Sequence, residues 1–190
     1  MVRAFIALEL SPALQEELGA VSQNLASAGA DVKWVEPGKI HLTLKFLGEV
    51  SEEQIPKIKA ALDPVAARFQ PFQFHAAGVG VFPHASAPRV LWVGIEEAQK
   101  AKGILQNLAK EVEKAMEILG FHKEERPFSP HLTIGRVRTS CNLSSLAAAL
   151  QKSSFQSAEE ERVDRIILFQ STLTPTGPVY QKLHETPFPR

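Results

Sequence analysis

The sequence is poor in the residues and runs that mark several protein classes. Its 190 residues include one cysteine, Cys141, which excludes an intramolecular disulfide framework and any metal site built from several thiolates. No stretch approaches the roughly twenty apolar residues that a membrane helix needs. The apolar run after Met1 is too short for a secretion signal and is interrupted by Glu9. We therefore expect a cytoplasmic protein that makes no membrane contact.

The chain also lacks an excess of charge of either sign. Twenty-one Lys and Arg residues balance 21 Asp and Glu residues, so no global field draws the protein to nucleic acid or membrane. An extended RNA footprint would need clustered cations, so this balance favours recognition of a terminus over that of a long tract. With 44% hydrophobic residues, the chain can bury a substantial core. We expect a single domain over residues 1–190, acting as a monomer.

What the sequence does contain is a repeated tetrapeptide. HLTL at 41–44 recurs as HLTI at 131–134, ninety residues further on. Each copy lies in an apolar run rich in strand-forming residues, at 40–47 and 131–137, which predicts a strand. Because strand side chains alternate between faces, the His and the Thr of each copy point the same way, and the Leu between them points into the opposite layer. Each predicted strand thus presents one imidazole beside one hydroxyl.

The predicted elements repeat as well, in two halves at about 1–82 and 88–190. Each half follows the order strand, long helix, motif strand, short helix, strand. In the first half we expect strands at 3–10, 32–35, 40–50 and 72–81, and helices at 11–28 and from 51 onward; in the second, strands at 89–95, 131–137, 163–173 and 179–184, and helices at 96–119 and 142–150. The fold class is therefore α+β, a bilobal architecture with pseudo-twofold symmetry. Two antiparallel-sheet lobes with outer helices would surround a central cleft, with the chain ends free to cross between lobes. His41 and His131 would face each other across that cleft.

These motifs resemble those of the two-histidine (2H) phosphoesterase superfamily. The resemblance rests on HLTL and HLTI, on KFLG at 45–48 and on the Gly135-Arg136 pair, and it runs from FIAL at 5–8 through PRVLW at 88–92 to GPVY at 177–180. Within the superfamily, the chain is similar to the RNA 2′,3′-cyclic phosphodiesterases, historically called 2′-5′ RNA ligases. The resemblance implies hydrolysis of a 2′,3′-cyclic phosphate at an RNA 3′ end, or on a nucleotide, to a 2′-phosphate, with no metal and no cofactor. It also implies that His41 is the proton donor to the leaving 3′-oxygen and His131 the proton acceptor from water.

The residue types suit that chemistry. Opening a cyclic phosphodiester is helped by a base on water and an acid on the departing oxygen, and imidazole titrates close enough to neutrality for both roles. The hydroxyls of Thr43 and Thr133 share the histidine faces and can bind the non-bridging phosphoryl oxygens. Arg136 has the planar fork that suits phosphate, but strict alternation turns it away from His131, so a solvated arginine is an equal alternative.

Other side chains are assigned by the same alternation. Lys45, four residues after His41, is expected on the His41 face, near RNA or at the rim, whereas Phe46 is expected in the core. Candidates for stacking on a base are Trp34, Phe82, Phe128 and Tyr180, although such aromatic residues more often serve packing. The acidic run at 159–161 is expected on a loop surface.

Three competing functions stay open on the sequence. Two histidines could ligate zinc, although no third ligand lies at a helpful spacing. The substrate could instead be a small cyclic phosphate, such as an ADP-ribose derivative, or the enzyme could run the reverse 2′-5′ ligation. The cleft could also bind nucleotides without turnover, although binding alone does not require two proton-transfer groups.

Overall fold

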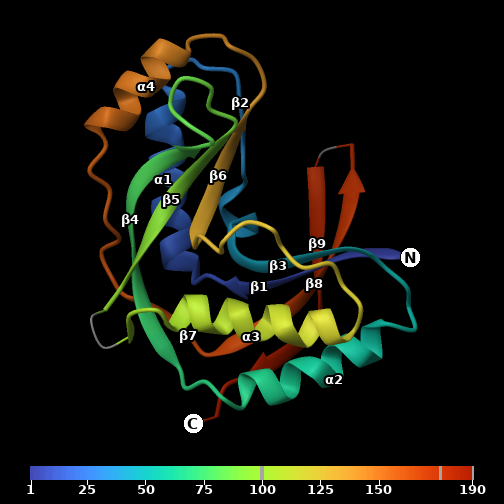
Figure 1. Ribbon diagram of the computed structural model, residues 1–190. Helices are drawn as coiled ribbons and strands as arrows, with labels where there is room; N and C mark the ends of the chain where they lie inside the picture. The colour runs from blue at the N-terminus through green and yellow to red at the C-terminus, as the bar shows by residue number, and fades with distance from the viewer. Residues whose placement is uncertain (99–100, 176, 190) are drawn as a thin grey trace.

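The computed structural model describes residues 1–98, 101–175 and 177–189, which form two antiparallel sheets and the helices around them (Figure 1). Sheet A has the strand order β3-β1-β8-β9, with β1 at Val2–Glu9, β3 at His41–Val50, β8 at Arg165–Thr174 and β9 at Gly177–Pro187. Sheet B has the order β2-β6-β5-β4-β7, with β2 at Val32–Trp34, β4 at Phe72–Phe82, β5 at Val90–Glu97, β6 at His131–Val137 and β7 at Glu161–Val163. The predicted α+β class with two antiparallel sheets is confirmed.

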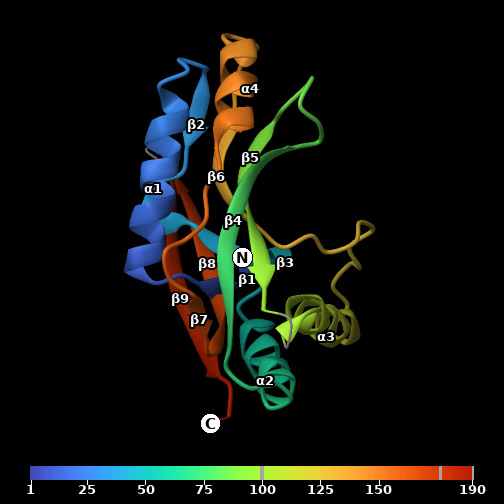
Figure 2. The same ribbon diagram turned by 90° about the vertical axis from the view of Figure 1, so that its left-hand side faces the viewer.

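Helices cover one side of each sheet. They are α1 at Pro12–Ala26, α2 at Ile55–Ala66, α3 at Ile104–Ile118 and α4 at Leu143–Lys152, with a 3₁₀ turn η1 at Pro37–Lys39. Helix α1 contacts β6 and α4, beside sheet B, whereas α2 contacts β8 and β9 and α3 contacts β3, beside sheet A. Figure 2 shows the two helix pairs at opposite ends of the molecule.

The two sheets do not correspond to the two halves of the chain. Strand β4 ends the first half but pairs with β5, for example Val81 opposite Leu91. Strand β8 belongs to the second half but pairs with β1, with Phe169 opposite Phe5. Helix α3 likewise lies on β3 of the first half. The first half, 1–82, therefore supplies β2 and β4 to sheet B, and the second half, 88–190, supplies β8 and β9 to sheet A.

The core lies on the helix-covered side of both sheets. Leu42 and Leu44 of β3 and Leu132 and Ile134 of β6 are all buried, and one cluster of buried apolar side chains contains them together with residues of α1, α2, α3 and α4. Burying a leucine side chain is worth about 1.5–3 kcal/mol, so each motif strand is fixed by its apolar face. Its other face is left for the histidine and threonine.

Polar groups at the helix starts fix where two helices begin. Ser11 Oγ accepts the Leu14 N–H at 3.2 Å and Pro12 opens α1, as the sequence predicts. Helix α3 was expected from residue 96, and that start is wrong. Strand β5 continues to Glu97, whose carboxylate accepts the N–H groups of Gly103 at 2.6 Å and Leu105 at 2.7 Å, so the helix begins at Ile104. The expected helix at 99–100 lies outside the described residues.

Within the described ranges, no helix combines the length and the apolar character that crossing a membrane requires. The monomeric state, the single domain and the cytoplasmic location stay predictions.

Candidate active site

The two tetrapeptides begin the two equivalent strands β3 and β6. In β3, His41 and Thr43 are partly exposed while Leu42 is buried between them. In β6, His131 and Thr133 are partly exposed around the buried Leu132. The two strands contact each other across the sheets. The imidazole and the hydroxyl of each motif therefore share a face, as the alternation predicts.

Each motif strand carries a β-bulge at the same place. Thr43 and Lys45 of β3 lie opposite the consecutive residues Ala7 and Ile6 of β1, so Leu44 is an extra residue in the strand. In β6, Thr133 and Gly135 lie opposite the consecutive residues Trp92 and Leu91 of β5, so Ile134 is extra. An inserted residue reverses the alternation of the residues that follow it, up to the next bulge.

The bulges overturn three of the assignments made from strict alternation, those of Lys45, Phe46 and Arg136. Lys45 is not on the His41 face: it is 2% exposed and lies on the core side of β3. Phe46 is not in the core: it is 61% exposed and lies on the His41 face, 6.2 Å from the ring of Phe5. The same shift places the exposed Arg136 on the His131 face. A bulge is set by pairing with a distant strand, so local spacing could not reveal it.

Both imidazoles are held in the same way. His41 Nδ1 lies 2.8 Å from the Lys39 carbonyl oxygen, and His131 Nδ1 lies 2.7 Å from the Ser129 carbonyl oxygen. Each partner is the backbone two residues before the histidine. A carbonyl oxygen only accepts, so Nδ1 carries the hydrogen in both rings, and Nε2 is the nitrogen left for proton transfer.

Aromatic rings enclose His41. Its ring stacks on Phe5 at 4.7 Å between centroids and meets the edge of Tyr180 at 5.2 Å. Phe5 and Phe169 belong to a second buried cluster on this face of sheet A, against which Tyr180 packs. This burial lowers the pKa of His41, and the hydrogen bond to the Lys39 carbonyl opposes the shift only in part. The unliganded protein therefore favours the neutral imidazole at position 41.

His131 has aromatic neighbours from sheet B. The ring of Phe82 meets it edge-on at 5.0 Å, and Phe82 also lies 5.2 Å from Trp92. Trp92 lies beside Thr133 in register and covers Gly80, where an added Cβ would come within 2.3 Å of the indole. Glycine at position 80 is therefore required for the ring to lie flat against the sheet beside the site.

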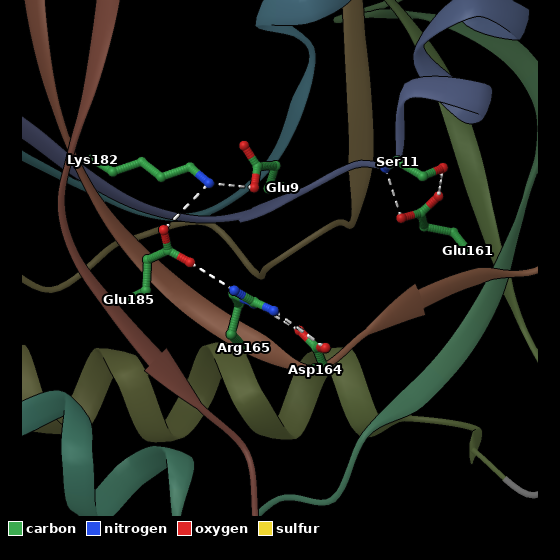
Figure 3. A network of polar contacts seen from close by, with 7 residues as sticks. All are labelled: Glu9, Ser11, Glu161, Asp164, Arg165, Lys182 and Glu185. Atoms are coloured by element: carbon green, nitrogen blue, oxygen red, sulfur yellow. Dashed lines mark hydrogen bonds and ion pairs between the residues drawn. The ribbon is translucent and has the colours of Figure 1, made fainter.

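Positive charges from both sheets act on Tyr180. Burial raises the pKa of its phenol, and the charges of Arg136, Lys39 and Arg3 counter that effect. Tyr180 contacts His41, and Arg136 of the second motif strand acts on the same phenol, in keeping with the contact between β3 and β6. Glu9, opposite His41 in register, is paired with Lys182 at 2.6 Å (Figure 3).

The remaining sequence candidates divide into two kinds. Phe82 and Tyr180 contact the motif histidines, whereas Trp34 and Phe128 pack against the core. In the part of the chain that the structure describes, no three His, Cys, Asp or Glu side chains gather in a way that could hold a metal ion.

Known proteins resemble this chain along almost its whole length. The family model described as LigT like Phosphoesterase matches residues 8–92 and 95–180. An Archaeoglobus fulgidus protein named RNA 2′,3′-cyclic phosphodiesterase is 38% identical, over 96% of this chain and 98% of its own length. A protein of the same name from Methanothermobacter thermautotrophicus is 36% identical over 94% of this chain and 95% of its own.

Solved structures share this fold over almost the whole chain. TT0787 of Thermus thermophilus superposes with a TM-score of 0.81 at 27% identity, covering 98% of this chain and 97% of that one. The LigT protein of E. coli, in complex with 3′-AMP, gives a TM-score of 0.72 at 23% identity over 100% and 99% of the two chains, which shows a shared fold. The family model and the two relatives match almost the whole chain, including both HxT strands. This chain therefore belongs to the LigT-like family of 2H phosphoesterases.

Proposed function

We propose that this protein hydrolyses the 2′,3′-cyclic phosphodiester at RNA 3′ ends to a 2′-phosphomonoester. The observation that carries the proposal is the matched pair of imidazoles. Each is held at Nδ1 by the carbonyl two residues earlier, each leaves Nε2 for proton transfer, and each lies beside a threonine on the same strand face. The relatives named RNA 2′,3′-cyclic phosphodiesterase support the substrate class.

The reaction needs one proton taken and one given. His131 Nε2 accepts a proton from water, whose oxygen attacks phosphorus. The bond from phosphorus to the 3′-oxygen breaks in line with the attack, and His41 Nε2–H donates its proton to that oxygen. The products are a 2′-phosphate and a free 3′-hydroxyl, and no redox step or cofactor takes part.

The roles of donor and acceptor impose a condition on His41. As the donor it must carry a second proton, although burial lowers its pKa in the unliganded protein. A phosphodiester anion beside the ring stabilises the imidazolium and raises the pKa again. Binding of the substrate therefore favours protonation of His41, while the Lys39 carbonyl oxygen accepts the Nδ1–H of both the neutral and the protonated ring.

The groups around the histidines bind the rest of the substrate. The Thr43 and Thr133 hydroxyls donate to the non-bridging phosphoryl oxygens, and the Arg136 guanidinium neutralises the charge that grows on them. On the His41 side, the exposed ring of Phe46 offers a face on which the terminal base stacks. One phosphate and one base suffice for this contact set, which fits a terminus and a chain of zero net charge.

The experiment uses a short RNA that ends in a 2′,3′-cyclic phosphate, incubated with excess EDTA and with wild-type, His41→Ala or His131→Ala protein. We expect the wild type to yield the 2′-phosphate and each variant to form it about 10²- to 10⁴-fold more slowly. Undiminished turnover in either variant would overturn the mechanism, and loss of activity with EDTA would favour a metal site. Joined RNA products would indicate ligation, and binding without any turnover would indicate a nucleotide-binding module.

A second substrate separates the two roles. Replacing the bridging 3′-oxygen by sulfur gives a leaving group that departs as a thiolate and needs no acid. We expect this substrate to restore turnover by His41→Ala and not by His131→Ala. Rescue of His131→Ala instead would reverse the assignment of donor and acceptor.

A further inference from the structure

We propose that the buried ion pair between Lys45 and Glu113 positions His131, by fixing the backbone connection that leads into β6. Lys45 belongs to the first motif strand, so one motif would set the geometry of the other motif's base. The inference rests on the proposed function only in taking His131 as a proton-transfer group. Lys45 and Glu113 are positioning residues in this scheme, since neither touches the substrate.

Lys45 is anchored at two points on the second half of the chain. The bulge at Leu44 turns it to the core side of β3. Its Nζ donates to Glu113 Oε1 of α3 at 2.7 Å and to the carbonyl oxygen of His122 at 2.9 Å. The buried ammonium therefore holds both α3 and the backbone just after it.

Glu113 adds a third point. The same Oε1 that binds Lys45 also accepts the N–H of Glu124, at 3.2 Å. His122 and Glu124 lie in residues 121–130, which link α3 to β6 without helix or strand structure. This connection includes Ser129, whose carbonyl holds the His131 ring. In this scheme the ion pair fixes residues 121–130, and this connection in turn fixes the position and the tautomer of the His131 imidazole.

The two histidines differ in what supports their carbonyl partners. Lys39, the partner of His41, ends the 3₁₀ turn η1, which has its own hydrogen bonds from Lys39 N–H to the Glu36 oxygen at 2.8 Å and from Ile40 N–H to the Pro37 oxygen at 3.1 Å. Ser129 lies in irregular backbone instead. An external anchor is therefore needed at the second motif and not at the first.

The second motif strand has no room for a reciprocal anchor. Gly135 takes the place that Lys45 holds in the first motif, and an added Cβ would come within 2.7 Å of Val32 Cγ1 and 3.1 Å of Trp34. Stability alone also fails to explain the buried pair, because replacing such a pair by apolar residues of similar volume is often neutral or stabilising. A positional role accounts for an ammonium at this place.

The test replaces the whole pair, in Lys45→Met/Glu113→Leu, so that no buried charge is left without its partner. The matched control is Arg68→Met/Glu111→Leu, which makes the same change at an ion pair between Glu111 of the same helix α3 and Arg68, a residue after α2 whose guanidinium is exposed. Three properties are measured for each protein: the melting temperature, kcat and KM on the cyclic-phosphate RNA, and the imidazole ¹⁵N chemical shifts of His131, assigned with His131→Asn.

We expect the pair variant to stay folded and to keep its KM, while kcat falls on the order of tenfold to a hundredfold. The ¹⁵N shifts should change from the Nδ1–H tautomer to a mixture with the Nε2–H form, and the control should match the wild type. A folded pair variant with wild-type kcat and tautomer would overturn the inference. If the wild type shows the tautomer but no turnover, the proposed function fails while the positioning is still decided by the ¹⁵N shifts.

If the pair variant does not fold, Lys45→Met decides the question. It removes the buried ammonium and leaves Glu113, whose side chain is 19% exposed and open to water, so no fully buried charge loses its partner and this variant should fold. It removes the donor to both Glu113 Oε1 and the His122 carbonyl oxygen. We expect the same changes in kcat and tautomer, and wild-type values in this folded variant would overturn the inference.

Discussion

Phe46 and Arg136 are equivalent residues of the two halves. Each lies five positions after a motif histidine, and each is returned to that histidine's face by the bulge that lies between the two. One half thus offers an exposed aromatic ring and the other an exposed guanidinium. In the proposed function, the same kind of β-bulge places one side chain to stack on a base and the other to bind a phosphate.

Phe46→Ala should lower kcat/KM on cyclic-phosphate RNA and leave the fold unchanged. Base–aromatic stacking is worth about 1–3 kcal/mol by alanine substitution, which corresponds to roughly a 5- to 150-fold loss of kcat/KM. Steady-state kinetics on cyclic-phosphate RNA would measure it. The control is Ile118→Ala, which trims another exposed apolar side chain, at the end of α3. Equal effects of the two substitutions would argue against stacking at Phe46.

Arg136→Ala should remove most turnover, and Arg136→Lys should recover only part of it. A lysine restores the charge but not the planar fork that binds two phosphoryl oxygens at once. Arg162→Ala is the control, because β7 lies at the opposite edge of sheet B from the β2–β6 pair. Wild-type kcat and KM for Arg136→Ala would mean that the guanidinium is solvated and does not bind the phosphate.

At Thr43 and at Thr133, two substitutions separate the role of the hydroxyl from that of the branched shape. Valine keeps the branched shape and removes the hydroxyl, whereas serine keeps the hydroxyl and removes the methyl group. We expect valine to lower kcat by at most about 10²- to 10³-fold, the cost of one lost donor to a developing charge, and serine to preserve it. The reverse order, with a lowered melting temperature for serine, would make the threonines structural.

The partly buried His41 makes stability depend on pH. Its pKa is lower in the folded state, so the unfolded state binds more protons once the pH falls below about 6.5, and the free energy of unfolding decreases as the pH falls through that range. Above it, both states are neutral at this residue and the contribution vanishes. Urea unfolding at pH 7.5 and pH 5 should show a smaller loss for His41→Asn than for the wild type. Equal losses would mean that burial does not penalise the imidazolium.

Glu161 carries a structural role that the acidic run at 159–161 does not reveal. It is 5% exposed, and its carboxylate accepts the Ser11 N–H at 2.9 Å and the Ser11 hydroxyl at 2.7 Å (Figure 3), so its assignment to a loop surface is wrong. Glu161→Ala should lower the free energy of unfolding by about 1–3 kcal/mol, because two donors at the start of α1 lose their acceptor. Denaturant titration would measure it. The exposed neighbour Glu159→Ala should leave stability unchanged, and a similar loss there would contradict the assignment.

The sequence predicts the site better than its surroundings. The motif strands, expected at 40–50 and 131–137, lie at His41–Val50 and His131–Val137, since burial of Leu42 and Leu132 sets the alternation locally. Lys45 and Phe46 were assigned to the wrong faces because the bulge depends on how β3 pairs with β1. Glu161 likewise binds a serine 150 residues away in the chain. What local spacing determines was predicted, and what distant pairing determines was not.

The strand exchange between the sheets has a consequence for folding. Because β4 completes the sheet of β5 and β8 completes the sheet of β1, neither half of the chain holds a finished hydrogen-bonded layer by itself. Such pairings close long loops, so conformational entropy of the chain is lost before the strand contacts can stabilise the fold. The two halves must therefore assemble in one cooperative event rather than one after the other. A destabilised molecule would lose the arrangement of both motif histidines together, and no partly folded form would keep one of them in place.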